Sequence, residues 1–167
     1  MPEAVCDTGP ALHLEEVGRL TALSLVAPLL LPDLVLKELE TRGLGAARLR
    51  EVGIAFTVRG VEPLVWRKVA RDVEPRIQPA DAQVFSLAQA SGFRSLVLTD
   101  DLALRRLLEK HGNPVTGTVG VLIRAYTARS ISRDEMETAF EALFEKSTLH
   151  LGPAFRVYVR KLLADLP

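Results

Sequence analysis

The sequence of 167 residues contains little of what several protein classes require. Its one cysteine, Cys6, excludes an intrachain disulfide framework, fits a reducing compartment and is expected to be a small core residue. Aromatic residues make up 5% of the chain, so the composition indicates no stacking platform for single-stranded nucleic acid. Lys plus Arg and Asp plus Glu each number 21, so any basic surface that attracts a polyanion has to be local.

Long hydrophobic runs are also missing. The most apolar stretch, residues 20–31, is interrupted by polar residues and by Pro28, and it is shorter than the ~20 residues that a membrane span needs. Glu3 and Asp7 occupy positions where a secretory signal peptide has a basic and then an apolar segment. We therefore expect a soluble, cytoplasmic protein with no membrane partner.

The remaining composition, 48% hydrophobic and 25% charged, is typical of a globular protein. The length favours a single domain over residues 1–167. Short apolar segments alternate with segments of helical periodicity, which predicts an α/β fold with a mostly parallel sheet of four to five strands. The expected strands are 4–7, 27–31, 54–58, 95–99 and 114–116. The expected helices are 11–17, 33–41, 45–52, 64–73, 80–90, 102–111, 117–128, 132–146 and 154–164.

Helix boundaries have their own signals in the sequence. Asp33 is the expected N-cap of its helix, and Gly92 is the expected stop after the helix over 80–90. Ser132 with Glu135 three residues later predicts a capping box.

Several common sites are missing from the sequence. Residues 43–48 lack the third glycine of a dinucleotide fingerprint and follow a helix, and there is no Walker sequence or nucleophile elbow. The three histidines, His13, His111 and His150, have no paired spacing, which disfavours a zinc site. The chemistry therefore has to come from carboxylates.

Three acids follow predicted buried strands directly. Asp7 ends the first strand, and Asp100 and Asp101 follow the strand over 95–99. Open α/β sheets place ligands at the carboxyl ends of their strands, and most of all where the strand order reverses. Two adjacent acids repel each other unless a cation lies nearby, although one of them can simply be the N-cap of the next helix.

Two further acids lie on predicted helices. Glu38 follows Val35 by three residues at the edge of an apolar face, and Asp81 precedes Val84 by three in a first helical turn. Each has a plain structural explanation, a snorkelling surface glutamate and an anion near a helix N-terminus. If both point to the same sheet edge as Asp7, the cluster offers only oxygen ligands. Such a set suits Mg²⁺ or Mn²⁺ and phosphodiester hydrolysis by activated water.

Taken together, these motifs resemble the PIN-domain family, the fold of VapC-type toxin ribonucleases, over nearly the whole chain. The four motifs are Asp7-Thr8-Gly9-Pro10, Pro32 with Val35 and Glu38-Leu39, Asp81-Ala82-Gln83-Val84 with Ala88, and Thr99-Asp100-Asp101. More narrowly, residues 98–101 with Arg105, followed by residues 115–122, resemble a PIN-like branch of formerly unknown function. The chain departs from that branch at Asp81, where the branch more often has Gly-Glu.

The resemblance implies a three-layer α/β/α sandwich and metal-dependent cleavage of RNA. Toxins of this family are held inactive by a small antitoxin protein and many of them dimerise, so the resemblance also implies an antitoxin and a homodimer. The catalytic residues that it implies are Asp7, Glu38, Asp81 and Asp101. The predicted ligands of Mg²⁺ or Mn²⁺ are Asp7, Asp81, Asp100 and Asp101. The predicted substrate contacts are the Thr8 hydroxyl and the arginines Arg105 and Arg106, which lie near the start of the helix after the acidic pair.

Two hypotheses follow from these observations. The first is a Mg²⁺/Mn²⁺-dependent endoribonuclease, supported by the five acids. The second is a catalytically weak or silent PIN-like binding or regulatory module, supported by the altered motif at Asp81 and by the zero net charge. Phosphotransfer through Asp7 as nucleophile fits poorly, because the downstream Thr and Lys that such enzymes need are not placed around it.

Overall fold

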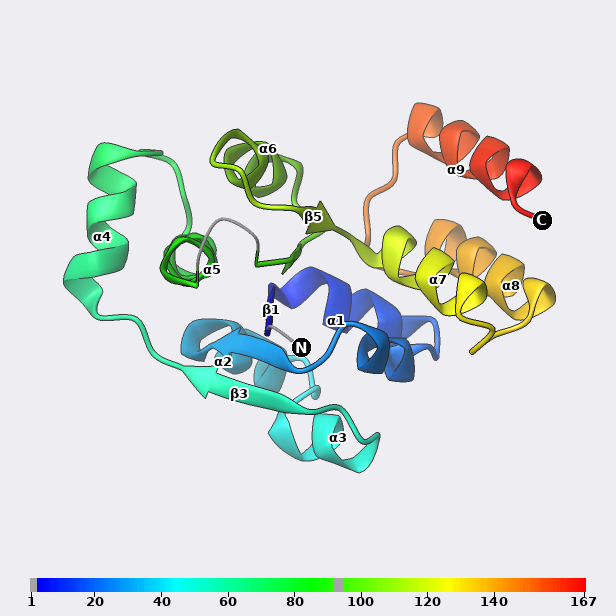
Figure 1. The fold of residues 1–167 in the computed structure, drawn as a ribbon, viewed down its shortest axis with the longest axis horizontal. Coiled ribbons are helices and arrows are strands. Elements are labelled where there is room, and N and C mark those ends of the chain that lie inside the picture. The colour runs from blue at the N-terminus through cyan, green and yellow to red at the C-terminus, as the bar shows by residue number, and fades with distance from the viewer. Residues whose placement is uncertain (1–2, 92–94) are drawn as a thin grey trace.

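Five parallel strands form the centre of the protein. The computed structural model describes residues 3–91 and 95–167. Within them the strand order is β3-β2-β1-β4-β5, and helices lie on both sides of the sheet (Figure 1). The strands are β1 (Ala4–Cys6), β2 (Leu29–Pro32), β3 (Phe56–Arg59), β4 (Val97–Leu98) and β5 (Val115–Thr116). The predicted α/β sandwich with its parallel sheet is therefore confirmed.

Each expected helix is present in the structure. They are α1 (Thr8–Glu16), α2 (Asp33–Thr41), α3 (Ala46–Glu51), α4 (Pro63–Asp72), α5 (Pro79–Ala90), α6 (Leu102–Lys110), α7 (Thr118–Thr127), α8 (Arg133–Glu145) and α9 (Pro153–Asp165). A 3₁₀ helix, η1 (Leu20–Leu25), was not expected. The predicted stop at Gly92 lies outside the described residues. No helix in the described part of the chain is long and apolar enough to cross a membrane.

The hydrophobic core explains why the central strands are continuous apolar runs. All three residues of β1 and all four of β2 are buried, as expected for parallel strands that are covered on both faces. Cys6 belongs to this core, and burial raises the pKa of its thiol, so it is a packing residue as predicted. The strand order places β1 between β2 and β4. Strands β2 and β3 therefore lie on one side of β1, and β4 and β5 lie on its other side, so the strand order reverses between β1 and β4.

Two helix starts differ from the prediction. The helix α1 begins at Thr8 instead of residue 11, because the Asp7 side chain accepts a hydrogen bond from the Thr8 N–H and caps the helix. Asp33 is not an N-cap, since Pro32 occupies that position at the end of β2 and Asp33 is already helical. The Asp33 carboxylate instead accepts a hydrogen bond from Gln83 at 2.8 Å.

The capping box at the start of α8 is confirmed. The Ser132 Oγ accepts a hydrogen bond from the Glu135 N–H at 3.1 Å, and the Glu135 carboxylate accepts one from the Ser132 N–H at 2.8 Å. Two backbone groups that the helix leaves unpaired are thereby satisfied.

Replacing Ser132 by alanine is expected to lower the free energy of unfolding by about 1 kcal/mol, because it removes the acceptor for the Glu135 N–H. Urea denaturation followed by circular dichroism measures this change. Ser130→Ala is the matched control, since Ser130 is exposed and precedes the box. An equal loss in both variants would show that the capping box does not stabilise α8.

Candidate active site

Asp7 and Thr99 lie side by side at the carboxyl ends of the two central strands. Cys6 of β1 is in register with Leu98 of β4, and the Asp7 N–H donates to the Leu98 carbonyl at 2.9 Å. Asp7 and Thr99, which follow these two strand ends, therefore leave the sheet at the same edge. This is the point of strand-order reversal, where α/β sheets bind ligands.

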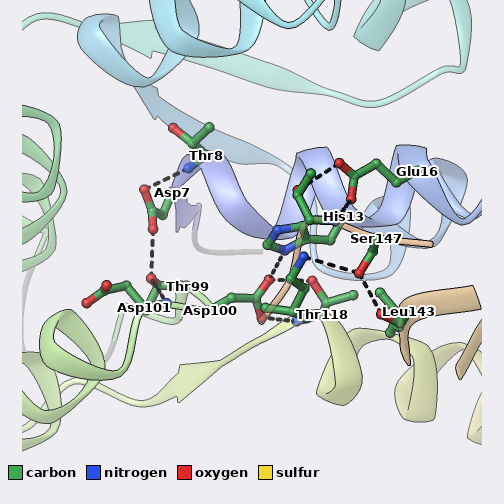
Figure 2. Close-up of polar contacts among 12 residues, drawn as sticks. Asp7, Thr8, His13, Glu16, Thr99, Asp100, Asp101, Thr118, Leu143 and Ser147 are labelled. Atoms are coloured by element: carbon green, nitrogen blue, oxygen red, sulfur yellow. Dashed lines mark hydrogen bonds and ion pairs between the residues drawn. The ribbon is translucent and has the colours of Figure 1, made fainter. Parts of the chain in front are cut away.

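The Asp7 carboxylate is held from two directions. Its Oδ1 accepts a hydrogen bond from the Thr8 N–H, and its Oδ2 accepts one from the Thr99 hydroxyl, both at 2.7 Å (Figure 2). The same Thr99 hydroxyl oxygen accepts from the Asp101 N–H at 3.1 Å. Asp7 is only 6% exposed and Thr99 is fully buried. One hydroxyl thus fixes Asp7 and joins it to the acidic segment after β4.

Glu38 reaches this edge from α2. Its Oε2 accepts a hydrogen bond from the Thr8 hydroxyl at 2.6 Å, although the Glu38 side chain is exposed. The first turn of α2 is held by Gln83 of α5, whose Oε1 accepts from the Leu34 N–H at 3.1 Å. Gln83 is 2% exposed. This buried amide fixes the helix of Glu38 relative to the helix that contains Asp81.

Asp81 lies in the electrostatic field of the other acids. Partial burial raises its pKa to about 7, and the negative charges of Asp7, Asp101 and Glu38 add to the shift. No hydrogen bond to its side chain is found among residues 3–91 and 95–167. Its carboxylate is therefore available to a ligand.

The pKa of Asp7 is also raised, to about 6. Burial is the largest cause, and the charges of Glu38 and Asp100 add to it. The hydrogen bonds from Thr99 and Thr8 act in the opposite direction, because they stabilise the charged form. Asp7, Glu38, Asp81 and Asp101 therefore repel one another, and this repulsion destabilises the edge unless protons or a cation neutralise it.

Asp101 has a structural role as well. It is the N-cap of α6, and its Oδ1 accepts a hydrogen bond from the Leu104 N–H at 2.7 Å. Its side chain is exposed at the carboxyl edge. The N-cap explanation is thus correct for Asp101, and its second oxygen accepts no hydrogen bond from residues 3–91 and 95–167.

Asp100 has hydrogen-bond partners of its own, apart from these four acids, although its negative charge also raises the pKa of Asp7. Its Oδ1 accepts from the Thr118 N–H at 2.8 Å, and its Oδ2 accepts from the Thr118 hydroxyl at 2.6 Å and contacts Nδ1 of His13 at 2.7 Å. In Figure 2 these partners lie apart from the Asp7–Thr99 contact. Since both oxygens are engaged, Asp100 joins α1 to the start of α7, and the structure does not bring its carboxylate into the cluster.

Two of the three predicted substrate contacts, Thr8 and Arg105, contact residues of this edge. The Thr8 hydroxyl donates a hydrogen bond to Glu38, and Arg106 is exposed on α6. Arg105 is partly buried, and its guanidinium lies 3.4 Å from the carbonyls of both Thr99 and Val115. It is therefore next to the residue that holds Asp7.

The donor set fits a hydrated divalent cation. Within the described residues no three Asp, Glu, His or Cys side chains lie close enough together to enclose an ion by themselves. Mg²⁺ keeps several of its water molecules and usually binds through one or two carboxylates together with substrate phosphates. Neighbouring carboxylates raise the pKa of Asp7 and the pKa of Asp81, and a set of this kind suits such a mode of binding.

Sequence reasoning missed the residues that position the acids. Gln83 and Thr99 were noted only as parts of motifs, although a polar residue among buried neighbours indicates a fixed hydrogen-bond partner. His13 was considered only as a zinc ligand, and its partner Asp100 is 87 residues away in the sequence. No local pattern identifies such a pair.

A family model described as a PIN domain matches residues 3–164, which include all five strands and the four clustered acids. No curated protein and no solved structure matches the chain.

Replacing Asp81 by asparagine is expected to stabilise the metal-free protein near pH 8. The folded-state pKa of about 7 lies above the ordinary 3.8, so between these values the folded chain binds more protons than the unfolded chain. Its stability then falls as the pH rises through this window. Because an amide has no charge to lose, Asp81→Asn should have a higher Tm than the wild type near pH 8 in EDTA, and the same Tm near pH 4.

Thermal unfolding at both pH values measures this difference. The control is Asp165→Asn, an exposed acid near the end of α9, which should show no pH-dependent gap. A gap of equal size near pH 4 and pH 8 for Asp81→Asn would contradict the electrostatic explanation.

Proposed function

The chain belongs to the PIN-domain family, and from this premise we propose that it is a divalent-metal-dependent endoribonuclease. PIN domains have a nuclease fold and typically use divalent metal ions. The observation that best supports the proposal is the mutual repulsion of Asp7, Glu38, Asp81 and Asp101 at one edge of the sheet. Strongly perturbed pKa values cluster at functional sites, and a bound cation would relieve this repulsion.

The proposal gives each residue a distinct role. Mg²⁺ or Mn²⁺ bound at this edge supplies charge neutralisation at the phosphodiester and an activated water. Asp7 and Asp101 hold the ion, and the Thr99 hydroxyl fixes the orientation of Asp7. Asp81, whose pKa is near neutrality, accepts a proton at a carboxylate oxygen.

The other two side chains at the edge complete the arrangement. Glu38 takes the Thr8 hydroxyl as its hydrogen-bond partner, which keeps that hydroxyl close to Asp7. Arg105 and Arg106 contact phosphates of the RNA. The substrate is RNA in this proposal because the motifs resemble those of VapC-type toxin ribonucleases.

A catalytically silent PIN-like module is the second candidate. It is favoured by the lack, within residues 3–91 and 95–167, of a compact group of three metal-binding side chains. Calorimetric titration with Mn²⁺ discriminates between the two candidates. Binding at micromolar to millimolar Mn²⁺ that is lost in Asp7→Asn supports the nuclease, and no binding in this range supports the silent module.

Asp7→Asn and Asp101→Asn are each expected to reduce metal-dependent RNA cleavage by about a hundredfold or more. Loss of a residue that only supports a metal ligand already costs about 10- to 100-fold, so loss of a ligand should cost at least as much. The fold should persist in Asp101→Asn, because asparagine is as good an N-cap as aspartate.

Gel-based cleavage of a labelled RNA with Mn²⁺ and with EDTA measures these rates, and circular dichroism checks the fold. Asp165→Asn is the surface control and should cleave like the wild type. Undiminished cleavage in both Asp7→Asn and Asp101→Asn would rule out this site.

We also propose that the enzyme is the toxin of a toxin–antitoxin pair, on the strength of the same resemblance. Induced expression of the wild-type chain should then arrest bacterial growth, and Asp7→Asn should not. Co-expression of a small antitoxin protein encoded beside the gene should restore growth. Unimpaired growth with active, soluble enzyme would exclude the toxin role. A homodimer stays a prediction that sedimentation velocity can test.

A further inference from the structure

A groove of about 570 Å³ lies beside the carboxyl end of β5, and its lining residues come from β5, α6, α7, α9 and the segment before α9. Its volume is within the range of sites that bind small organic ligands. The groove is lined by apolar side chains from all these elements, by the glycines Gly117 and Gly120, and by the rings of Phe155 and Tyr158. Asp100 and Arg105 form its inner end, next to the acidic cluster.

Two aromatic rings stand on the α9 wall. Phe155 and Tyr158 are three residues apart on one helix face, with ring centroids 5.9 Å apart and ring planes inclined by 39°. They are 41% and 57% exposed, which is unusual for such large apolar groups. Val157 is 67% exposed on the same helix but does not line the groove. Both exposed rings therefore lie at the groove, a local pairing that the low aromatic content of the chain did not lead us to expect.

Arg105 connects the groove to the acidic cluster. Its guanidinium donates to the carbonyls of Thr99 and Val115 at 3.4 Å each and lies 3.6 Å from the Glu109 carboxylate. These distances are long for charged hydrogen bonds, which are usually 2.7–2.9 Å. The cation therefore keeps most of its capacity for a phosphate. The Thr99 that Arg105 contacts is also the residue whose hydroxyl donates a hydrogen bond to Asp7.

In the Gly117-Thr118-Val119-Gly120 segment, the two glycines that line the groove have no side chain. A Cβ atom at Gly117 would lie 2.5 Å from Oδ1 of Asp100 and 3.2 Å from Nη2 of Arg105. A Cβ atom at Gly120 would collide with the Thr116 hydroxyl. A larger residue at Gly117 would displace Asp100 or Arg105, and one at Gly120 would displace the Thr116 side chain, so both positions need the close backbone approach that glycine allows.

We propose that this groove binds a nucleobase of single-stranded RNA, stacked on Phe155 and Tyr158, while Arg105 contacts the phosphate between that base and the cleaved bond. The choice of RNA as ligand rests on the proposed ribonuclease function. Aromatic and arginine side chains are the usual partners of unstacked bases. Arg105 also joins the groove to the acidic edge, because it donates to the carbonyl of Thr99, the residue whose hydroxyl holds Asp7. An apolar peptide or a second copy of the chain would not use the cation at the inner end.

The test is fluorescence anisotropy with a labelled single-stranded RNA of about 12 mixed nucleotides, in EDTA and at low salt. Phe155→Ala with Tyr158→Ala should weaken binding on the order of ten- to a hundredfold. Val157→Ala is the matched control and should leave affinity unchanged. Tyr158→Trp, which keeps a ring in place, should bind at least as tightly as the wild type. An abasic oligonucleotide of equal length should bind the wild type as weakly as the RNA binds the double variant.

Equal affinity of the double variant and the wild type, or no binding by the wild type, overturns the inference. So does a change in sedimentation velocity caused by the two alanines, because the groove would then be an interface between copies. Circular dichroism establishes that the double variant is folded, and since both rings are exposed we expect no loss of structure. The assay needs no cleavage. Ring-dependent binding by a protein that does not cleave RNA would therefore refute the nuclease and leave the groove assignment standing.

Discussion

The hydrogen bond from the Thr99 hydroxyl to Oδ2 of Asp7 joins the ends of β1 and β4, the two strands at which the sheet order reverses. The same oxygen accepts the Asp101 N–H, so one buried hydroxyl holds both the acid after β1 and the segment that begins α6. Hydrogen bonds to a buried carboxylate favour its charged form, which burial and neighbouring charges disfavour. This contact therefore positions Asp7 and the segment of Asp101, whereas Gln83 joins the helices that contain Glu38 and Asp81.

Adjacent acids in the sequence have different functions in the structure. Asp101 faces the cluster and caps α6, whereas Asp100 binds His13 and Thr118 and joins α1 to α7. The contacts of Asp100 join α1 to α7, and those of Asp101 leave one carboxylate oxygen at the edge. Negative charges around Asp7 and Asp81 raise the pKa of both, and a hydrated cation at this edge can offset the repulsion.

The order of elements was predictable because each strand is a short apolar run and each helix has a clear period or cap, as Ser132 with Glu135 shows. The start of α1 and the role of Asp33 were not, since both depend on which partner a side chain finds in space. At the site, the acids could be named from their positions after strands. The contacts that separate Asp100 from Asp101, and the gathering of Phe155 and Tyr158 at one groove, depend on tertiary packing that no local pattern contains.

The central claim is that the acidic edge binds a divalent cation through Asp7 and Asp101. Anomalous diffraction from a crystal of the protein grown with Mn²⁺ and recorded near the manganese absorption edge tests it most directly. The account predicts a strong anomalous peak in contact with carboxylate oxygens of Asp7 and Asp101. No peak at this edge, or a peak only beside Asp100 and His13, would contradict it.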